Sequence, residues 1–257
     1  MRTTVSGEDQ YPKSGTPAGA AAGGTFEEAW SRAAEVPGWL TEAQARRLWD
    51  ETFSLGQGSH VVEIGSHQGR STLVLAAALC SHGQGGRLTA VDAFMTGPRY
   101  GGHLARVALE RNLRVAGLEG PVSIVANRSS EVRGTWQQPV DLVWVDGKHD
   151  FWTCSDDLKW SRHLPSGGHM LVHDAFSSIG VTTALLVHVF PSRRLRLIDR
   201  VDSLATLEVG PPDWGDRLRF LRQLPWWFRN IVVKVLLRLR MRSLTRLLGH
   251  RGPDDPY

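Results

Sequence analysis

The stretch VVEIGSHQGRST, residues 61–72, passes from an apolar run to two glycines and then to two hydroxyl residues. The apolar run predicts a buried strand, and the hydroxyl residues predict the start of a helix. Gly65 and Gly69 between them predict a tight turn that brings the backbone close to a ligand. Glu63 precedes the turn and suits a cationic ligand group better than a pyrophosphate. We therefore expect a binding site at the carboxyl end of this strand.

Composition limits the class of protein. The chain has 257 residues, of which 41% are hydrophobic, enough for one α/β core with appendages. Its two cysteines, Cys80 and Cys154, are too few for a disulfide scaffold and lack metal-ligand spacing. The N-terminal residues carry no apolar signal segment, and no run of roughly 18 apolar residues occurs. We expect a cytoplasmic protein.

Charge is distributed unevenly along the chain. The formal net charge is +4, yet ten basic residues and no acid lie between Arg217 and Arg251. Subtracting these ten charges and allowing for Asp254 and Asp255 leaves residues 1–216 at −4. Because the body is acidic, it shows no channel for nucleic acid.

The sequence divides into four segments. Residues 1–25 are rich in small residues and proline, which predicts a disordered leader. Residues 26–59 predict two N-terminal helices, and Trp39 and Leu40 between them either close over the substrate as a lid or pack in the core. Residues 60–210 predict the catalytic domain, and residues 211–257 predict a basic amphipathic extension.

The central segment alternates between strand and helix patterns, which predicts a doubly wound α/β sheet. The predicted strands are 60–64, 87–92, 121–126, 140–146, 168–173, 195–200 and 203–209. Helices are predicted at 70–81, 101–115, 129–134, 152–163 and 177–190. The last two strands are too close in sequence for a parallel crossover, so we expect them to pair as an antiparallel hairpin. The predicted sheet is therefore seven-stranded and mostly parallel, with its last strand reversed. A dinucleotide-binding sheet of the dehydrogenase type is normally all parallel, so the reversed last strand predicts a different variant of the doubly wound fold.

Three motifs in order carry a family resemblance: VEIGSHQGRST at the first strand, DLVWVDGKHDF at the fourth and LPSGGHMLVHDAF at the fifth. Over roughly residues 38–209 the chain resembles the class I S-adenosylmethionine-dependent methyltransferases. The subgroup is similar to macrocin O-methyltransferase and to cephalosporin hydroxylase-like proteins. The resemblance implies a Rossmann-like domain that binds S-adenosylmethionine.

The resemblance also implies where the cofactor lies. Glu63 would reach the methionine ammonium, Asp92 would hold the ribose, and Ser129 would lie near the adenine edge. The full predicted cofactor set is Glu63, Gly65, Ser66, Gly69, Ser71, Asp92, Ser129 and Asp146. Two alternatives stay open: Glu63 as a helix-capping or core acid, and Ser129 as a plain helix N-cap.

The predicted chemistry lies at the ends of the fourth and fifth strands. Asp146 and Asp174 end these strands, and two neighbouring carboxylates repel unless a proton or cation lies between them. Mg²⁺ or another divalent cation would relieve the repulsion and lower the pKa of a substrate hydroxyl. The predicted metal ligands are Asp146, Asp174 and His173, although His173 stands where similar proteins have a second acid.

The loop after the fourth strand supplies a candidate base. Methyl transfer to oxygen needs a deprotonated nucleophile, and a histidine pKa near 6.5 suits this task. We predict His149 and Asp146 as catalytic residues, with helix capping as the alternative role of His149. Asp157 matches a family acid that we interpret as structural.

These features predict an O-methyltransferase that acts on a hydroxyl of a sugar, glycolipid or other small metabolite. No Asn-Pro-Pro-Tyr type run follows the fourth strand, which disfavours methylation of amino groups. The alternative is a catalytically altered protein of this fold, either hydroxylase-like or a non-catalytic module at a membrane. A nicotinamide oxidoreductase is disfavoured by the GxxxG spacing. A homo-oligomer is compatible with the sequence.

The C-terminal segment predicts a basic amphipathic helix with its own partner. Lys234, Arg238, Arg242 and Arg246 recur every four residues. We predict contact of residues 217–251 with an anionic membrane surface; packing on protein and binding of nucleic acid are the alternatives. Membrane contact would make the protein peripheral at the inner face and favour a lipid-linked acceptor.

Overall fold

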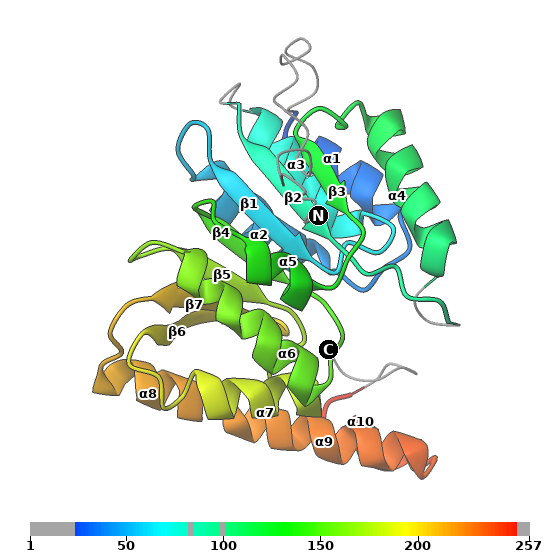
Figure 1. Cartoon of the computed structure of the whole chain (residues 1–257). Coiled ribbons are helices and arrows are strands. Elements are labelled where there is room, and N and C mark those ends of the chain that lie inside the picture. The colour runs from blue at the N-terminus through cyan, green and yellow to red at the C-terminus, as the bar shows by residue number, and fades with distance from the viewer. Residues whose placement is uncertain (1–23, 82–84, 98–100, 251–257) are drawn as a thin grey trace, which may run out of the picture.

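The computed structural model describes residues 24–81, 85–97 and 101–250 (Figure 1). Most of the predicted leader lies outside these residues. The strands are β1 (His60–Ile64), β2 (Arg87–Val91), β3 (Val122–Val125), β4 (Leu142–Val145), β5 (His169–Val172), β6 (Leu195–Val201) and β7 (Leu204–Val209). The helices are α1 (Phe26–Ala34), α2 (Glu42–Phe53), α3 (Arg70–Ser81), α4 (Gly102–Ala116), α5 (Ser129–Thr135), α6 (Phe151–Asp157), the 3-10 helix η1 (Leu158–His163), α7 (Ile179–His188), α8 (Trp214–Leu221), α9 (Leu224–Arg238) and α10 (Arg242–Leu247).

The strands form one seven-stranded sheet in the order β3-β2-β1-β4-β5-β7-β6. Strands β1 to β5 are parallel, whereas β7 is antiparallel to both β5 and β6. Only the two residues 202–203 join β6 to β7, which is why this pair is a hairpin. The predicted fold is confirmed, including the reversed strand.

Each face of the sheet is covered by its own set of helices. Alternate side chains of β1 enter two separate cores: Val61 packs with α1 to α4, while Val62 and Ile64 pack with α5 to α8 and η1. The sheet is therefore the middle of three layers (Figure 1). The carboxyl ends of the parallel strands meet along one edge, as required for a site there.

The N-terminal helices begin as the sequence predicts. Thr25 and Thr41 form capping boxes with Glu28 and Gln44, so both helices start at fixed residues. The two candidate lid residues, which lie between these helices, have different environments. Leu40 is buried in the core, and Trp39 is exposed beside the ring of His67 in the glycine turn.

Two predicted helices differ in detail. Residues 152–163 are not one α-helix, because α6 passes into η1 before Pro165, which favours extended backbone in the residue before it. The C-terminal segment is three helices. A break at Arg240, with φ of +60°, separates α9 from α10, and Arg229 Nε donates to the Leu248 carbonyl at 2.8 Å to hold α10 against α9.

Candidate functional site

The turn from Gly65 to Gly69 is fixed by protein contacts. Gly65 has φ of +92°, and a Cβ there would lie 2.2 Å from the carbonyl oxygen of Asp146. Gly69 has φ of +94°, and its Cβ would lie 2.5 Å from Leu109 Cδ1. The sequence suggested ligand approach as the reason for both glycines. The structure adds a second reason, since the backbone of Asp146 leaves no room for a side chain at Gly65 and the positive φ disfavours one at both positions.

Glu63 lies fully buried beneath the start of α3. Ser71 Oγ and Thr72 Oγ1 donate to its two carboxylate oxygens at 2.5 and 2.6 Å. Burial raises the pKa of Glu63 to about 7, although these hydrogen bonds act in the opposite direction. The observed contacts are those of the core-network alternative. Contact with a cofactor ammonium stays a prediction, and a cation there would stabilise the charged carboxylate.

Asp92 joins the ends of two neighbouring strands. Its Oδ2 accepts from the His67 amide at 2.8 Å, and its Oδ1 accepts from the Phe94 amide at 2.7 Å. Both donors have left-handed backbone, with φ of +45° and +43°. A carboxylate has about four acceptor positions, so Asp92 retains capacity for a ribose diol.

Ser129 is the first residue of α5, and the N-cap is Arg128. The Ser129 hydroxyl donates to the carboxylate of Asp157, which is 1% exposed. Burial raises the pKa of Asp157 to about 7. The N-cap alternative for Ser129 is thus wrong, because its side chain reaches across to α6 instead. Its place near an adenine stays a prediction.

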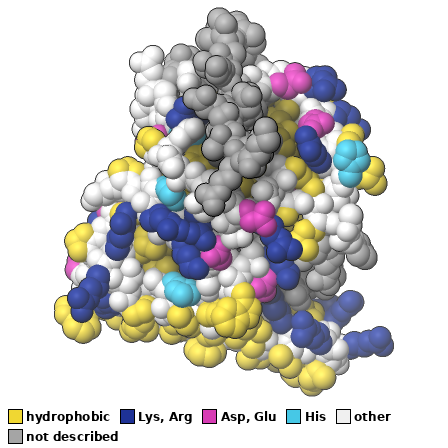
Figure 2. All heavy atoms as spheres, in the orientation of Figure 1, with side chains coloured by type: hydrophobic (Ala, Val, Ile, Leu, Met, Phe, Trp, Pro, Cys, Tyr) yellow, Lys and Arg dark blue, Asp and Glu magenta, His cyan; other side chains and the backbone are white. Residues whose placement is uncertain are grey.

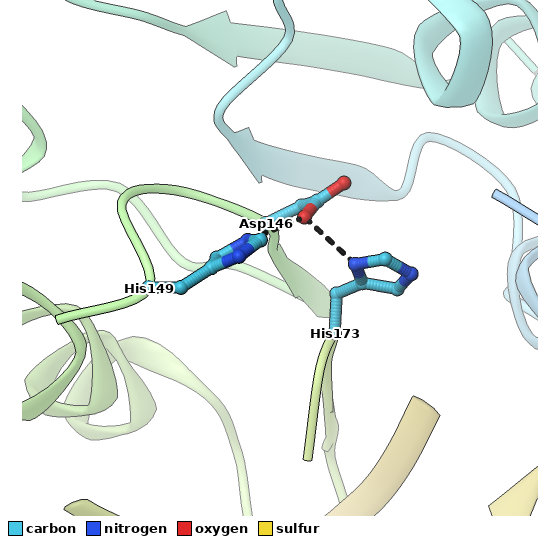
Figure 3. Close-up of side chains that lie close together, drawn as sticks. All are labelled: Asp146, His149 and His173. Atoms are coloured by element: carbon cyan, nitrogen blue, oxygen red, sulfur yellow. Dashed lines mark hydrogen bonds and ion pairs between the residues drawn. The ribbon is translucent and has the colours of Figure 1, made fainter. Parts of the chain in front are cut away.

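A cluster of histidines and carboxylates lies at the ends of β4 and β5 (Figure 3). Asp146 Oδ1 lies 3.0 Å from His173 Nδ1 and 3.4 Å from His149 Nε2. His173 is buried, whereas the His149 side chain is 42% exposed. Asp146 and His173 follow neighbouring parallel strands, and His149 reaches them from the loop before α6. Solvent therefore has access to the cluster from the His149 side.

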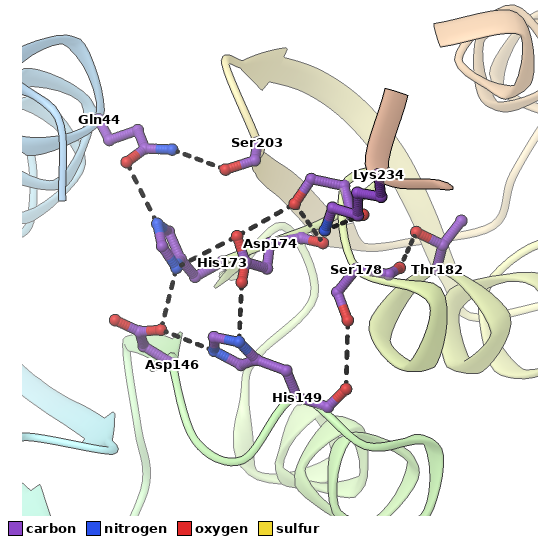
Figure 4. A network of polar contacts seen from close by, with 10 residues as sticks. Gln44, Asp146, His149, His173, Asp174, Ser178, Thr182, Ser203 and Lys234 are labelled. Carbon is purple, nitrogen blue, oxygen red and sulfur yellow. Dashed lines mark hydrogen bonds and ion pairs between the residues drawn. The ribbon is translucent and has the colours of Figure 1, made fainter. Parts of the chain in front are cut away.

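Each imidazole has a second polar neighbour on its other nitrogen (Figure 4). His149 Nδ1 lies 2.7 Å from Asp174 Oδ2, and His173 Nε2 lies 3.2 Å from Gln44 Oε1. Gln44 Nε2 in turn donates to Ser203 Oγ at 3.0 Å. These contacts fix the orientation of both rings around Asp146.

The charges of the cluster stabilise one another. Burial alone would raise the pKa of Asp146, but His173 and His149 outweigh it and lower the pKa. Burial alone would lower the pKa of His149, but hydrogen bonds to Asp146 and Asp174 raise it to about 10. The pKa of His173 is also raised, mainly by Asp146 against the effect of burial. A protonated imidazole cannot accept a proton from a hydroxyl, so a base role for His149 requires loss of that proton first.

The donor set of the cluster fits a divalent cation. Asp146, His149 and His173 each offer one ligand atom, and these atoms lie within 4.8 Å of one another. His173 Nδ1 is buried and close to Asp146 but lacks the alignment of a hydrogen bond. The predicted trio named Asp174 in place of His149. The structure puts Asp174 behind His149, where it orients the ring as carboxylates do for metal-bound histidines.

The cluster and the glycine turn are adjacent. The Asp146 carbonyl lies against Gly65, and a small cavity at the cluster is lined in part by Asp146, His149, His173 and Asp157. The sequence did not indicate Gln44 of α2, which contacts His173, or Ser203 of the β6–β7 turn, which accepts from Gln44. No sequence motif marks either residue as a partner of His173 or Gln44. From the sequence, Gln44 is predicted only as the third residue of a helix capping box.

Comparison with known proteins identifies the central segment. A model described as methyltransferase domain matches residues 62–175. Residues 62–175 are a methyltransferase domain. The predicted recognition is confirmed, and the match spans both the glycine turn and the histidine–carboxylate cluster.

Solved structures share the fold of this methyltransferase domain and its flanking helices. Cofactor-bound Rv0187 from MTB is 23% identical, with 73% of this chain and 88% of that chain covered and a TM-score of 0.54. An O-methyltransferase from Bacillus cereus in complex with SAH is 18% identical, with 72% and 90% covered and a TM-score of 0.53. The O-methyltransferase TomG from Streptomyces achromogenes, involved in tomaymycin synthesis and in complex with SAM, is 17% identical, with 72% and 89% covered and a TM-score of 0.52. These likenesses establish the fold.

Proposed function

We propose that the protein is an S-adenosylmethionine-dependent O-methyltransferase acting on a hydroxyl of a sugar, glycolipid or other small metabolite. One observation carries the proposal: the histidine–carboxylate cluster lies against the glycine turn of a methyltransferase domain, where the Asp146 carbonyl meets Gly65. A donor bound at the turn and an acceptor bound at the cluster would therefore be neighbours. The proposal is supported by the similar structures of two O-methyltransferases, one in complex with SAH and one with SAM.

The donor half uses the residues around the turn. Glu63 is proposed to face the ammonium, Asp92 the ribose and Ser129 the adenine edge. Gly65, Ser66, Gly69, Ser71 and Asp146 complete the proposed set. A methionine ammonium beside the buried Glu63 would offset the cost of its desolvated charge, which supports the assignment.

The acceptor half must remove a proton. As the acceptor oxygen attacks the methyl carbon, the C–O bond forms and the C–S bond of the sulfonium breaks, and S-adenosylhomocysteine leaves with the electron pair of that bond. The hydroxyl proton passes to solvent water, which has access to the cluster from the His149 side. Asp146, His149 and His173 would hold a divalent cation, which would bind the hydroxyl and lower its pKa. Asp174 and Gln44 would keep both imidazoles oriented. Two nitrogen donors and one oxygen donor favour a transition metal over Mg²⁺.

Cofactor binding can be tested by thermal shift. S-adenosylhomocysteine should raise the melting temperature, and NADH at the same concentration should not. Stabilisation by NADH alone would overturn the assignment. Incubation with S-adenosylmethionine and an extract of metabolites, followed by a mass search for products heavier by one methylene, would then identify the acceptor.

A second candidate is a hydroxylase-like protein of the same fold. It is favoured by one observation, since two histidines and one carboxylate are also the ligands of non-haem iron oxygenases. Metal analysis of the protein and oxygen consumption with Fe²⁺ would separate the two. Oxygen-dependent turnover without methyl transfer would favour the hydroxylase-like candidate over the methyltransferase.

A further inference from the structure

Helices α8 and α9 each expose an apolar stripe. On α8 the stripe is Trp214, Leu218 and Leu221, and on α9 it is Phe228, Val232 and Val235, followed by Leu239 at the C-cap. Spacings of three and four residues place each set on one side of its helix. Trp214 is 87% exposed and Phe228 is 57% exposed. Large apolar side chains thus recur along the outer side of consecutive helices.

The opposite side of α9 is docked on the methyltransferase domain. Asn230 is buried and its Nδ2 donates to the Phe176 carbonyl at 3.3 Å, while Val233 has no exposed surface. Lys234 Nζ donates to the Ser177 carbonyl at 3.0 Å. Packing on protein therefore accounts for one side of α9. It leaves the second apolar side facing outward.

Arginines flank the outward stripe. In Figure 2, hydrophobic side chains gather along the lower rim of the molecule, with Lys and Arg side chains at both ends of that rim. Five exposed arginine side chains in this segment make no hydrogen bond or ion pair within the described part of the chain: Arg222, Arg238, Arg240, Arg242 and Arg246. No acid occurs between Arg217 and His250.

Helix α10 extends the same surface. It folds back on α9, with Thr245 buried between them and Leu247 82% exposed. Arg242 and Arg246 lie on this short helix. Apolar side chains with flanking arginines therefore continue past the break at Arg240.

We propose that α8, α9 and α10 form a surface that binds an anionic lipid bilayer. A bilayer suits both the apolar stripe and the arginines of this surface. The stripe would enter the boundary of the acyl chains, and the arginines would pair with lipid phosphates. A second copy of the chain fits less well, since its matching patch would carry the same positive charge. Nucleic acid would engage the arginines but offers little for the exposed Trp214 and Phe228 stripe. Among the described residues no helix has the length and hydropathy to cross a bilayer.

The test is co-sedimentation of the full chain with vesicles of phosphatidylcholine, with and without phosphatidylserine. We expect pelleting with the anionic vesicles. The double variant Arg238→Glu/Arg246→Glu should bind these vesicles at least about tenfold more weakly, because each arginine near such a surface contributes roughly fivefold. Phe228→Ser/Val235→Ser should also lose binding while leaving the charge unchanged.

Matched controls lie on the opposite side of the molecule. Arg32→Glu/Arg111→Glu, on α1 and α4, changes the net charge equally. Leu104→Ser/Val115→Ser removes two apolar side chains of α4 that are even more exposed than Phe228 and Val235. Both should pellet like the wild type, and unchanged melting temperatures would show that all variants fold. Equal pelleting of all variants, dimerisation through Phe228, or binding of duplex DNA without vesicle binding would each overturn the proposal. Stabilisation by S-adenosylhomocysteine is independent of every one of these outcomes.

Discussion

The glycine turn and the histidine–carboxylate cluster lie side by side but are built differently. The turn is held by backbone groups and by hydroxyls, as where Asp92 accepts two amides and Glu63 accepts from two residues of α3. The cluster consists of charged side chains whose pKa values depend on one another. The comparison teaches that substitutions in the proposed donor half act mainly by disturbing the backbone geometry. In the proposed acceptor half, they act mainly by changing the charges of the side chains and the binding of protons and metal ions.

The strongest test of this contrast is Gly65→Val. The substitution adds strain at a φ of +92° and a clash with the Asp146 carbonyl. We expect the free energy of unfolding to fall by more than about 3 kcal/mol, measured by urea denaturation. Gly134→Ala is the control, because nothing lies within 4 Å of its added Cβ. A small loss for Gly65→Val would show that the turn is not fixed by backbone geometry.

The next largest effect is expected for Asp146→Asn, which removes the charge shared by both imidazoles. Methyl transfer should fall about 100-fold or more. The pKa of His149 should drop from about 10 toward its ordinary value, which NMR titration of the imidazole would detect. Asp50→Asn, on an exposed face of α2, should change neither quantity. An unchanged His149 pKa would contradict the coupling.

Glu63→Gln tests the donor half through pH. The pKa of Glu63 is raised in the folded protein, to about 7, so the native state binds the extra proton. This favours folding below about pH 4.5, and the advantage is lost as pH rises toward 7. The wild type should lose on the order of 3 kcal/mol of stability across this window relative to Glu63→Gln, measured by urea denaturation at several pH values.

The same variant tests the predicted ammonium contact. A cationic ligand stabilises the Glu63 carboxylate, so S-adenosylhomocysteine should stabilise the wild type more than Glu63→Gln, and more so at pH 8 than at pH 6. Equal thermal shifts for both proteins at both pH values would rule out the contact and leave Glu63 as a core acid.

The smallest effect is expected for Asp174→Asn, which changes a neighbour of a proposed metal ligand. Affinity for Co²⁺, measured by its visible absorption on titration, should fall about tenfold. Ser178→Ala is the control, because the one hydrogen bond that Ser178 Oγ makes to the described residues goes to the backbone carbonyl of His149 and not to its ring. A loss as large as that of His149→Ala would instead make Asp174 a direct ligand.

The contrast also explains what the sequence could predict. The strand ends, the reversed strand and the positions of Glu63, Gly65 and Asp92 follow from local patterns of apolar residues and glycine. The grouping of His149 with His173, and the contact of Gln44 with that ring, depend on how a loop and a distant helix meet. The local periodicity of a sequence gives no information on such contacts between distant segments. The same limit applies to α9, whose apolar residues divide between a docked side and an exposed side only once Asn230 is buried.

The hydrogen bonds of α9 show that the segment matched as a methyltransferase domain ends before the packed structure does. The methyltransferase match ends at residue 175, yet the carbonyls of Phe176 and Ser177 accept from Asn230 and Lys234, and the Phe176 ring packs 5.2 Å from that of Phe220. These contacts all involve residues beyond the matched segment, so α8 and α9 dock on the part of the chain that directly follows it. The segment that matches the methyltransferase family model is therefore smaller than the segment that packs together, and β5, which ends two residues before Asp174, belongs to both.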